Sequence, residues 1–179
     1  MASALDIVRD EHRDILRILH MLEDLAEDET VLARGIQSGL IASIVQYLWI
    51  FPYAIHHPKE EKGLFPALTA KDGGTLVATI AELIGDHAKG YRLLREIENA
   101  MLASGAQGGI TRLRTAIRDY VDHKRRHIER EEREILPAVE RILDVENHTT
   151  VKKTFADLKI DKNILALFES LFPHRQKEK

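Results

Sequence analysis

The 179-residue sequence contains no cysteine. This absence excludes disulfide bonds, thiolate-bound zinc, iron–sulfur clusters held by cysteine and cysteine nucleophiles. A metal site in this chain must therefore use histidine nitrogen and carboxylate oxygen. A chain without disulfides is also typical of a reducing compartment, and we expect a cytoplasmic protein.

An excess of positive charge is absent as well. Lys and Arg number 26 against 29 Asp and Glu, which gives a formal net charge of −3. Such a chain has no basic field to hold nucleic acid or an anionic membrane, so we expect neither partner. A glycine-rich phosphate-binding loop and a Gly-x-Ser-x-Gly motif are also missing, so nothing in the sequence indicates nucleotide binding or serine hydrolysis.

Long uninterrupted hydrophobic runs are missing too. The longest apolar stretch extends from Leu40 to Ile55, is interrupted by Gln46 and Pro52, and is too short to span a bilayer. The N-terminus has neither a basic segment nor a long apolar segment, so it does not resemble a signal peptide. With 44% hydrophobic residues, we expect a soluble protein with a sizeable core.

Apolar residues recur at helical spacing through most of the chain, and no stretch of any length alternates as a strand does. The pattern breaks at residues 71–74 and 103–109, where glycine is frequent. Short loops between long helices predict an all-α fold, an antiparallel up-down-up-down four-helix bundle. The four predicted helices cover about residues 5–26, 36–68, 75–102 and 110–143.

Pro52 and Pro58 fall inside the second predicted helix, on either side of a His-His pair. A proline within a helix removes one backbone hydrogen bond, so we expect a kink there. After Asn147 the helical pattern weakens, which divides the chain into a bundle, residues 1–146, and a C-terminal helical extension with a polar tail, residues 147–179. The apolar residues that suggest short helices in this extension are Val151, Phe155, Leu158, Ile164, Leu165, Leu167, Phe168, Leu171 and Phe172.

Each predicted bundle helix carries one histidine on its apolar face, and two of the helices add a glutamate four residues later. Residues four apart lie one turn apart on the same face. Burying an imidazole and a carboxylate there is costly unless they are paired or bind a metal. Antiparallel helices joined by short loops bring the four histidines to one level. The candidate metal ligands are His12, His56, Glu60, His87, His127 and Glu131.

Four imidazoles and two carboxylates form a mixed nitrogen and oxygen site that suits iron, manganese, zinc or cobalt. Six ligands exceed the four of a tetrahedral zinc site, so the set predicts two metals, each with two histidines. Both glutamates would bridge the metals. Each metal then keeps an open position for a small ligand such as O₂, NO or peroxide.

Each histidine alone has a simpler interpretation. A single histidine on an apolar face is usually a core residue held by hydrogen bonds, and an isolated His-x-x-x-Glu pair usually lies at the surface. The joint pattern over four helices favours the metal site. His57 with Glu60 or Glu61 is an alternative to His56 with Glu60, but the repeated offset of four residues favours His56.

Several neighbouring residues are weaker candidates. His123 lies one turn before His127 and is interpreted as a polar lining residue, and the alternative is a role as a ligand or just outside the ligands. Tyr91 lies one turn after His87 and either donates a hydrogen bond to a bound ligand or, as we favour, packs. The candidates for this outer shell are His57, Tyr91 and His123. Residues predicted to be solvated or paired with Arg and Lys are Glu61, Glu129, Glu132 and Glu134.

Four segments carry a resemblance to the hemerythrin-like HHE cation-binding domain over about residues 5–145. Both His/Glu motifs end in Glu-Glu-x-x-Leu/Ile-Phe/Leu-Pro, which makes the resemblance specific. Residues 155–167 are similar to the tail that often follows this domain in bacteria. The matching segments are Glu11-His12, His56-His57-Pro58-Lys59-Glu60-Glu61 leading to Leu64-Phe65-Pro66, Asp86-His87, and His127 through Glu131-Glu132 leading to Ile135-Leu136-Pro137.

The resemblance implies a non-haem di-iron centre with the four histidines as ligands and Glu60 and Glu131 as bridges. Oxygen-carrying hemerythrins have a fifth histidine where this sequence has Tyr91. The set of four histidines and two glutamates is closer to that of the bacterial iron-centre repair proteins. Those proteins also carry an N-terminal segment with cysteine, and this sequence has no cysteine.

The function that we expect is binding or sensing of O₂, NO or a related small oxidant by two iron ions. The ligand types alone also suit manganese or zinc. One alternative is a di-iron enzyme that acts on peroxide or NO, and another is an iron storage or delivery protein. The sequence leaves open whether the chain is catalytic, and it does not set the oligomeric state.

Overall fold

Helical segments follow one another from Ala4 to Asp157 in the computed structural model, which describes residues 3–158 and residue 162. No strand occurs among those residues, which confirms the all-α prediction. Segments labelled η are π-helical. In chain order the segments are α1 Ala4–Glu27, α2 Glu29–Gln37, α3 Leu40–Ile50, η1 Phe51–His56, α4 His57–Lys59, η2 Glu60–Leu64, α5 Phe65–Thr69, α6 Val77–Leu102, α7 Gly109–Arg130, η3 Glu131–Ile135, α8 Leu136–Ile142 and α9 Val145–Asp157.

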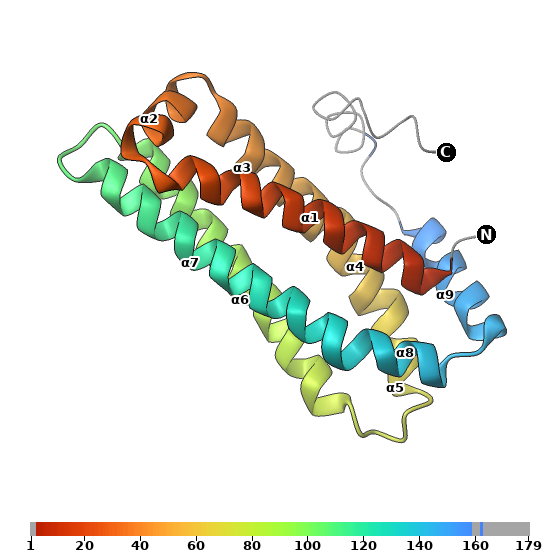
Figure 1. Cartoon of the computed structure of the whole chain (residues 1–179). Coiled ribbons are helices and arrows are strands. Elements are labelled where there is room, and N and C mark those ends of the chain that lie inside the picture. The colour runs from red at the N-terminus through yellow and green to blue at the C-terminus, as the bar shows by residue number, and fades with distance from the viewer. Residues whose placement is uncertain (1–2, 159–161, 163–179) are drawn as a thin grey trace.

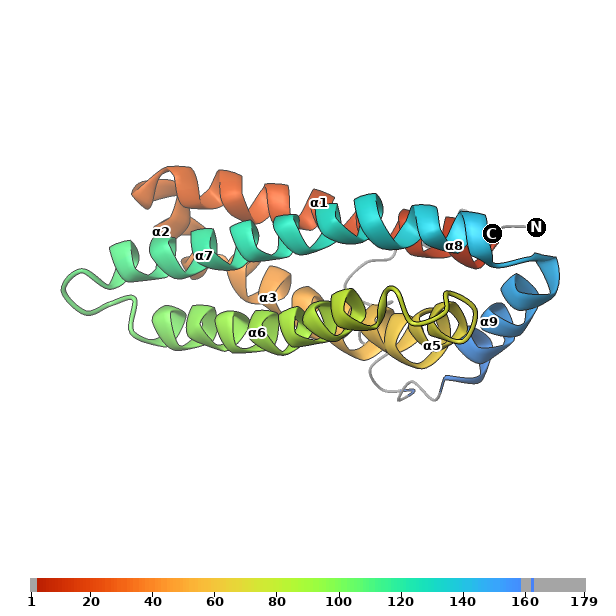
Figure 2. The same cartoon turned by 90° about the horizontal axis from the view of Figure 1, so that it is seen from below.

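Four long helical stretches lie side by side in Figures 1 and 2: α1, the stretch from α3 to α5, α6, and the stretch from α7 to α8. α1 packs against α3 and α7, and α6 packs against the same two helices. One boundary differs from the sequence prediction. The second long helix begins at Leu40 and not near residue 36, because Gly39, at φ 77°, separates it from α2.

α1 begins with a reciprocal cap. The Ser3 hydroxyl accepts a hydrogen bond from the backbone N–H of Asp6, and the Asp6 carboxylate accepts one from the backbone N–H of Ser3. This pairing satisfies two backbone donors that a helix start otherwise leaves free. The cap fixes where α1 starts, and therefore which of its residues face the other helices.

The prolines coincide with widened helical turns, where the sequence predicts a kink. In each π-helical segment a backbone N–H bonds the carbonyl five residues earlier: His57 to Pro52, Phe65 to Glu60, and Leu136 to Glu131. A proline ring clashes with the carbonyl four residues before it, and a wider turn accommodates that clash. Both Glu-Glu-x-x-Leu/Ile-Phe/Leu-Pro motifs therefore form one π-helical turn, with the candidate bridging glutamate as its first residue.

The buried apolar residues form two clusters. One cluster includes Ile15, Leu19 and Ile128, and the other includes Leu5, Val8 and the residues that follow the two His/Glu motifs. Between the clusters lies a layer of buried polar side chains. Along α1, for example, His12 separates Val8 of one cluster from Ile15 of the other. The polar layer therefore lies between the two apolar clusters.

The C-terminal extension begins with α9. Val151 and Phe155 are buried there, and α9 packs against η2 and α1. The predicted boundary between residues 146 and 147 falls inside this helix. The apolar positions from Ile164 to Phe172 lie outside the described residues.

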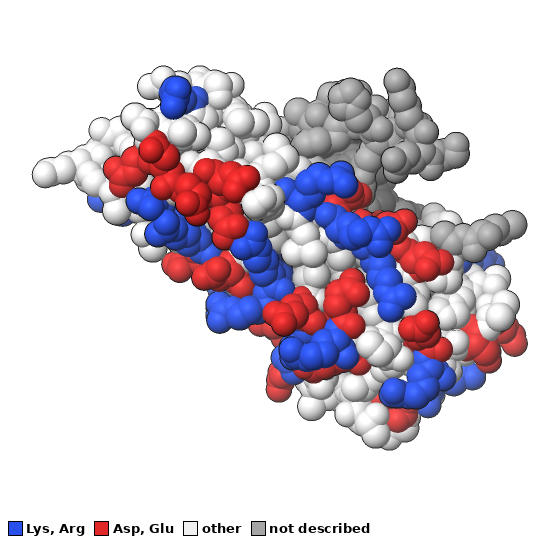
Figure 3. Space-filling model, viewed as in Figure 1, with Lys and Arg blue, Asp and Glu red and all other residues white. Residues whose placement is uncertain are grey.

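The surface carries both signs of charge. Figure 3 shows Lys and Arg side chains next to Asp and Glu side chains over much of one face. Arg125 of α7 donates two hydrogen bonds to Glu23 of α1, at 2.7 and 2.6 Å. Among the described residues no single helix is long and apolar enough to cross a membrane, while one bent pair, Glu29–Gln37 with Leu40–Thr69, meets the criteria of length and composition.

The contact between α9 and η2 gives a testable prediction for stability. A Cβ atom at Gly63 would lie 2.7 Å from Cε1 of Phe155, so Gly63→Ala must displace that ring. We expect this variant to lower the free energy of unfolding by about 1–3 kcal/mol, measured by chemical denaturation. The control is Gly85→Ala in α6, where a Cβ would meet nothing within 4 Å. Equal stability of the two variants would contradict this packing.

Candidate metal centre

All six candidate ligands converge in the polar layer, one histidine from each long helical stretch. His12 comes from α1, His56 from η1, His87 from α6 and His127 from α7, while Glu60 begins η2 and Glu131 begins η3. Each side chain is at most 5% exposed. The structure therefore places the four histidines at one level, as the sequence predicted. Their role as metal ligands stays a prediction.

Glu60 lies between two pairs of histidines. Its Oε1 atom is 3.6 Å from Nε2 of His12 and 3.4 Å from Nε2 of His56, and its Oε2 atom is 3.4 Å from Nε2 of His87. Glu131 makes a similar set of contacts. Its Oε2 atom is 3.3 Å from Nε2 of both His12 and His127, and its Oε1 atom is 3.8 Å from Nε2 of His87. Each glutamate thus faces both histidine pairs.

The inner atoms of this group have no hydrogen-bond partner. The unpartnered buried atoms include Nε2 of all four histidines, Oε2 of Glu60 and both carboxylate oxygens of Glu131. Leaving so many buried polar atoms unpaired is costly unless something else binds them. Donors at about 2.0–2.2 Å from one metal lie roughly 3.0–3.5 Å apart, close to the distances seen here. The residues therefore fit a metal centre.

A second ring of carboxylates surrounds the histidines. Nδ1 of His12 donates to Glu132 at 2.7 Å, Nδ1 of His56 to Glu11 at 3.0 Å, and Nδ1 of His87 to Glu61 at 2.6 Å. For His127, Nδ1 lies 3.9 Å from the Asp86 carboxylate. Because Nδ1 carries a proton in each of these three bonds, a ring that gives up its other proton presents the Nε2 lone pair to the interior.

The ring of outer carboxylates is cyclic. The acid of α1 accepts a hydrogen bond from the histidine of the second long stretch, the acid of that stretch accepts one from α6, and the acid that follows α7 accepts one from α1. The acid of α6 faces the histidine of α7 at 3.9 Å, and Nδ1 of that histidine has no hydrogen-bond partner. Each outer acid is the direct chain neighbour of an inner residue on its own helix. Each of these short sequence segments therefore contributes an inner residue and an acid that faces the histidine of another helix.

Both inner glutamates are ionised at neutral pH. Burial opposes their charge, but the histidines around them hold the pKa of Glu60 well below its usual range. Burial and the charge of Glu60 likewise oppose the charge of Glu131, yet His127, His12 and His87 lower the pKa of Glu131 to about 2. The centre therefore carries two buried negative charges, which favour cations.

The pKa values of His12 and His87 are shifted in the opposite direction from that of His127. Burial disfavours the charge of His12 and His87, but the carboxylates raise the pKa of His12 well above its usual value and that of His87 to about 10. Burial and the ammonium of Lys124 lower the pKa of His127 to about 4. At neutral pH, protons on His12 and His87 balance the glutamates until a metal replaces them.

These pKa values predict a pH dependence of metal binding. A raised pKa means that His12 and His87 hold protons at pH 7, and a metal must displace them. Affinity should therefore fall as the pH is lowered from about 8 to about 5, and binding should release protons. Titration calorimetry in buffers of different ionisation enthalpy measures that release. Metal binding with no proton release at pH 7 would contradict the assignment.

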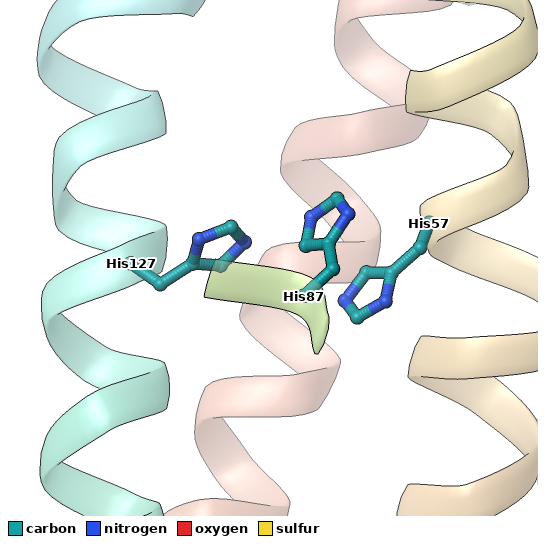
Figure 4. A group of neighbouring side chains, drawn as sticks. All are labelled: His57, His87 and His127. Atoms are coloured by element: carbon teal, nitrogen blue, oxygen red, sulfur yellow. The ribbon is translucent and has the colours of Figure 1, made fainter. Parts of the chain in front are cut away.

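His57, the alternative to His56, lies beside the centre and faces a different group. Its Nε2 atom is 3.1 Å from Nζ of Lys124, and both side chains are buried. The His57 ring stacks on the ring of His87, with 3.7 Å between centroids. Figure 4 shows these two rings together with His127 in the space between the helices. The geometry therefore favours His56 with Glu60, which contact each other directly.

The two other outer candidates do not point at the centre. Tyr91 is 45% exposed and packs edge-on against Trp49 and Tyr53, which agrees with the packing role that we favoured. His123 is buried, and its Nε2 atom donates to the backbone carbonyl of Asp86 at 2.9 Å. His123 therefore holds the backbone beside His87 and acts on the centre only through it.

Two predictions about acidic residues were incomplete. Glu132 lies 3.8 Å from Arg9, and both Glu61 and Glu132 are more than one-third exposed, as predicted, but each also accepts a hydrogen bond from a candidate ligand. Glu134 pairs with Arg130 and Arg133 as predicted. Sequence reasoning also missed Glu11, Asp86 and Lys124. A signal for the acids was present, because each adjoins an inner ligand in the sequence.

Comparison with known proteins agrees with this geometry. Residues 3–139 match the family model described as the hemerythrin HHE cation-binding domain, which spans most of the chain and includes all six candidate ligands. A search of curated proteins found no significant match, and neither did a search of solved structures. The polar layer, its unpartnered inner atoms and the family match lead to one conclusion: this chain belongs to the hemerythrin HHE cation-binding family.

Proposed function

We propose that this chain holds two iron ions in an antiparallel up-down-up-down four-helix bundle and binds a small ligand such as O₂ or NO there. The observation that carries the proposal is the set of inward-facing nitrogen and oxygen atoms without hydrogen-bond partners. Bound iron would supply redox chemistry and open coordination positions for the ligand. On the composition of the sequence we further propose a cytoplasmic protein without a nucleic-acid or membrane partner.

The division of ligands between two metals is proposed from the contacts of Glu60, because Oε2 of Glu131 contacts His12 and His127 alike. One oxygen of Glu60 faces His12 and His56, and the other faces His87. A carboxylate whose two oxygens face different histidine groups is placed to bridge two metals. We propose His12 and His56 for one iron, His87 and His127 for the other, and Glu60 and Glu131 as bridges.

Ligand binding is favoured over turnover by the surroundings of the centre. Tyr91 and His123 do not act as proton donors at the inner residues, because one packs at the surface and the other donates to a backbone carbonyl. The outer carboxylates are engaged by the histidines. These features support a site that holds a ligand.

The test uses protein loaded with Fe(II) without oxygen. Exposure to O₂ or to NO should change the visible spectrum, and removal of the gas should reverse the change. Peroxide and NO consumption measured on the same sample should stay stoichiometric with iron. Irreversible oxidation with no adduct, or many turnovers per centre, would contradict the proposed binding role.

A further inference from the structure

One buried cation has no part in the function proposed above. Lys124, in α7, is 1% exposed, and its Nζ atom is hydrogen-bonded to Nε2 of His57 at 3.1 Å. Within residues 3–158 no carboxylate lies within ion-pair distance of this ammonium, although the charges of Glu131, Glu60 and Asp86 act on it from farther away. Burying a cation without a direct anionic partner is costly, so its retention beside a metal centre calls for an explanation.

The partner of Lys124 is itself placed like a metal ligand. His57, His87 and His127 each offer a nitrogen within 4.8 Å of the other two. Figure 4 shows their three rings projecting from three different helical stretches into one space. Nε2 is the ring nitrogen farther from the main chain, and it is the atom that reaches into that space. With nothing bound to it, this nitrogen would be a fifth histidine donor.

The hydrogen bond from Lys124 occupies Nε2 of His57, so this nitrogen is not available to a metal. An imidazole nitrogen has one lone pair, which either accepts a hydrogen bond or binds a metal. In the structure the lone pair of His57 Nε2 faces the Lys124 ammonium. The proposed metal position beside His87 and His127 therefore lacks one ligand, although His57 lies next to it.

A cavity borders His57 and His87. It has a volume of about 540 Å³ and lies between the stretch η1–η2 and α6. His57 and His87 form part of its wall, and Tyr91 is partly exposed there. Arg92 and Glu61 also line it, so its wall carries both signs of charge. A small anion entering by this cavity would reach the stacked pair of His57 and His87, with Lys124 bonded to His57.

We propose that Lys124 and His57 form an anion-binding wall on the His87 and His127 side of the centre. Lys124 holds His57 away from the metal, which leaves a coordination position free. The ammonium has further N–H groups, and these donate to a small anionic ligand in that position. This inference rests on the proposed metal centre and adds small anions to the neutral ligands, O₂ and NO, proposed above.

The first experiment measures azide affinity and iron content together. Lys124→Met removes the ammonium at nearly constant length, and Lys89→Met removes a charge from an exposed position of α6. Wild type and both variants should retain iron. Lys124→Met should bind azide about tenfold more weakly or worse, because a charge-assisted hydrogen bond is lost and His57 is free to take the position. Lys89→Met should bind azide as the wild type does.

Each outcome decides a separate point. Absence of iron from the wild type would refute the metal centre itself. Unchanged azide affinity in iron-loaded Lys124→Met would overturn the anion-binding wall, and so would loss of iron from Lys124→Met alone, since Lys124 would then serve to hold the metals.

A second experiment needs no variant and decides the matter even where Lys124→Met does not fold. In a crystal structure of the iron-loaded wild type with azide, we expect azide within hydrogen-bond distance of Nζ of Lys124 and no bond from His57 to iron. Ligation of iron by His57, or azide at the His12 and His56 side, would overturn the inference.

Discussion

Replacement of Glu131 by alanine is expected to reduce bound iron from two ions per chain to nearly none. Glu131 is the inner residue whose two oxygens both lack a hydrogen-bond partner, and it contacts His12, His87 and His127. Its loss would remove a proposed bridging ligand and one of the two inner carboxylates. Both proposed metal positions would therefore lose a ligand at once. His127→Ala should have nearly as large an effect, because it removes one of two histidines from its metal.

Iron per chain is measured by elemental analysis after reconstitution and desalting. The matched control is Glu129→Ala, two residues earlier, where the side chain is 71% exposed. Circular dichroism establishes that each variant keeps its helices. Wild-type iron content in folded Glu131→Ala would refute the assignment of this residue as a ligand.

The second large effect is expected from an outer carboxylate. Glu61→Ala removes the acceptor of the His87 Nδ1 proton, a bond of 2.6 Å. Without that acceptor the ring is free to turn or to change its tautomer, and its Nε2 becomes a weaker ligand. We expect metal affinity to fall about 10–100-fold, the usual effect of such outer groups.

Competition with a chelator of known affinity measures this change. Glu134→Ala is the control, because Glu134 pairs with arginines and has no bond to a candidate ligand. Asp86→Ala should have a smaller effect than Glu61→Ala, since Asp86 lies 3.9 Å from His127 Nδ1. Equal affinity of Glu61→Ala and Glu134→Ala would show that the outer ring does not support the centre.

The inner residues could be predicted from the sequence because helical spacing puts each of them on the buried face of its helix. His12 shares a helix face with Val8 and Ile15, and the structure buries all three. The offset of four residues carries His127 and Glu131 to one side of their helix in the same way. Buried polar residues on an apolar stripe are costly, and this cost is what made the pattern informative.

The outer shell was harder to predict because its partners come from different helices. Nothing local distinguishes Glu61 or Glu132 from solvated acids, since both are more than one-third exposed and lie in charged segments. Their bonds depend on the neighbour across the bundle. The same holds for Lys124, whose partner His57 is 67 residues away in the sequence. A helical period of 3.6 residues also does not predict the π-helical turns.

Two metals are expected to lie within the six inner residues. The most direct measurement is anomalous diffraction at the iron edge from crystals of reconstituted protein. We predict two peaks between the helices, one beside His12 and His56 and one beside His87 and His127, with Glu60 and Glu131 between them. A single peak, or peaks only at the surface of the protein, would contradict this account.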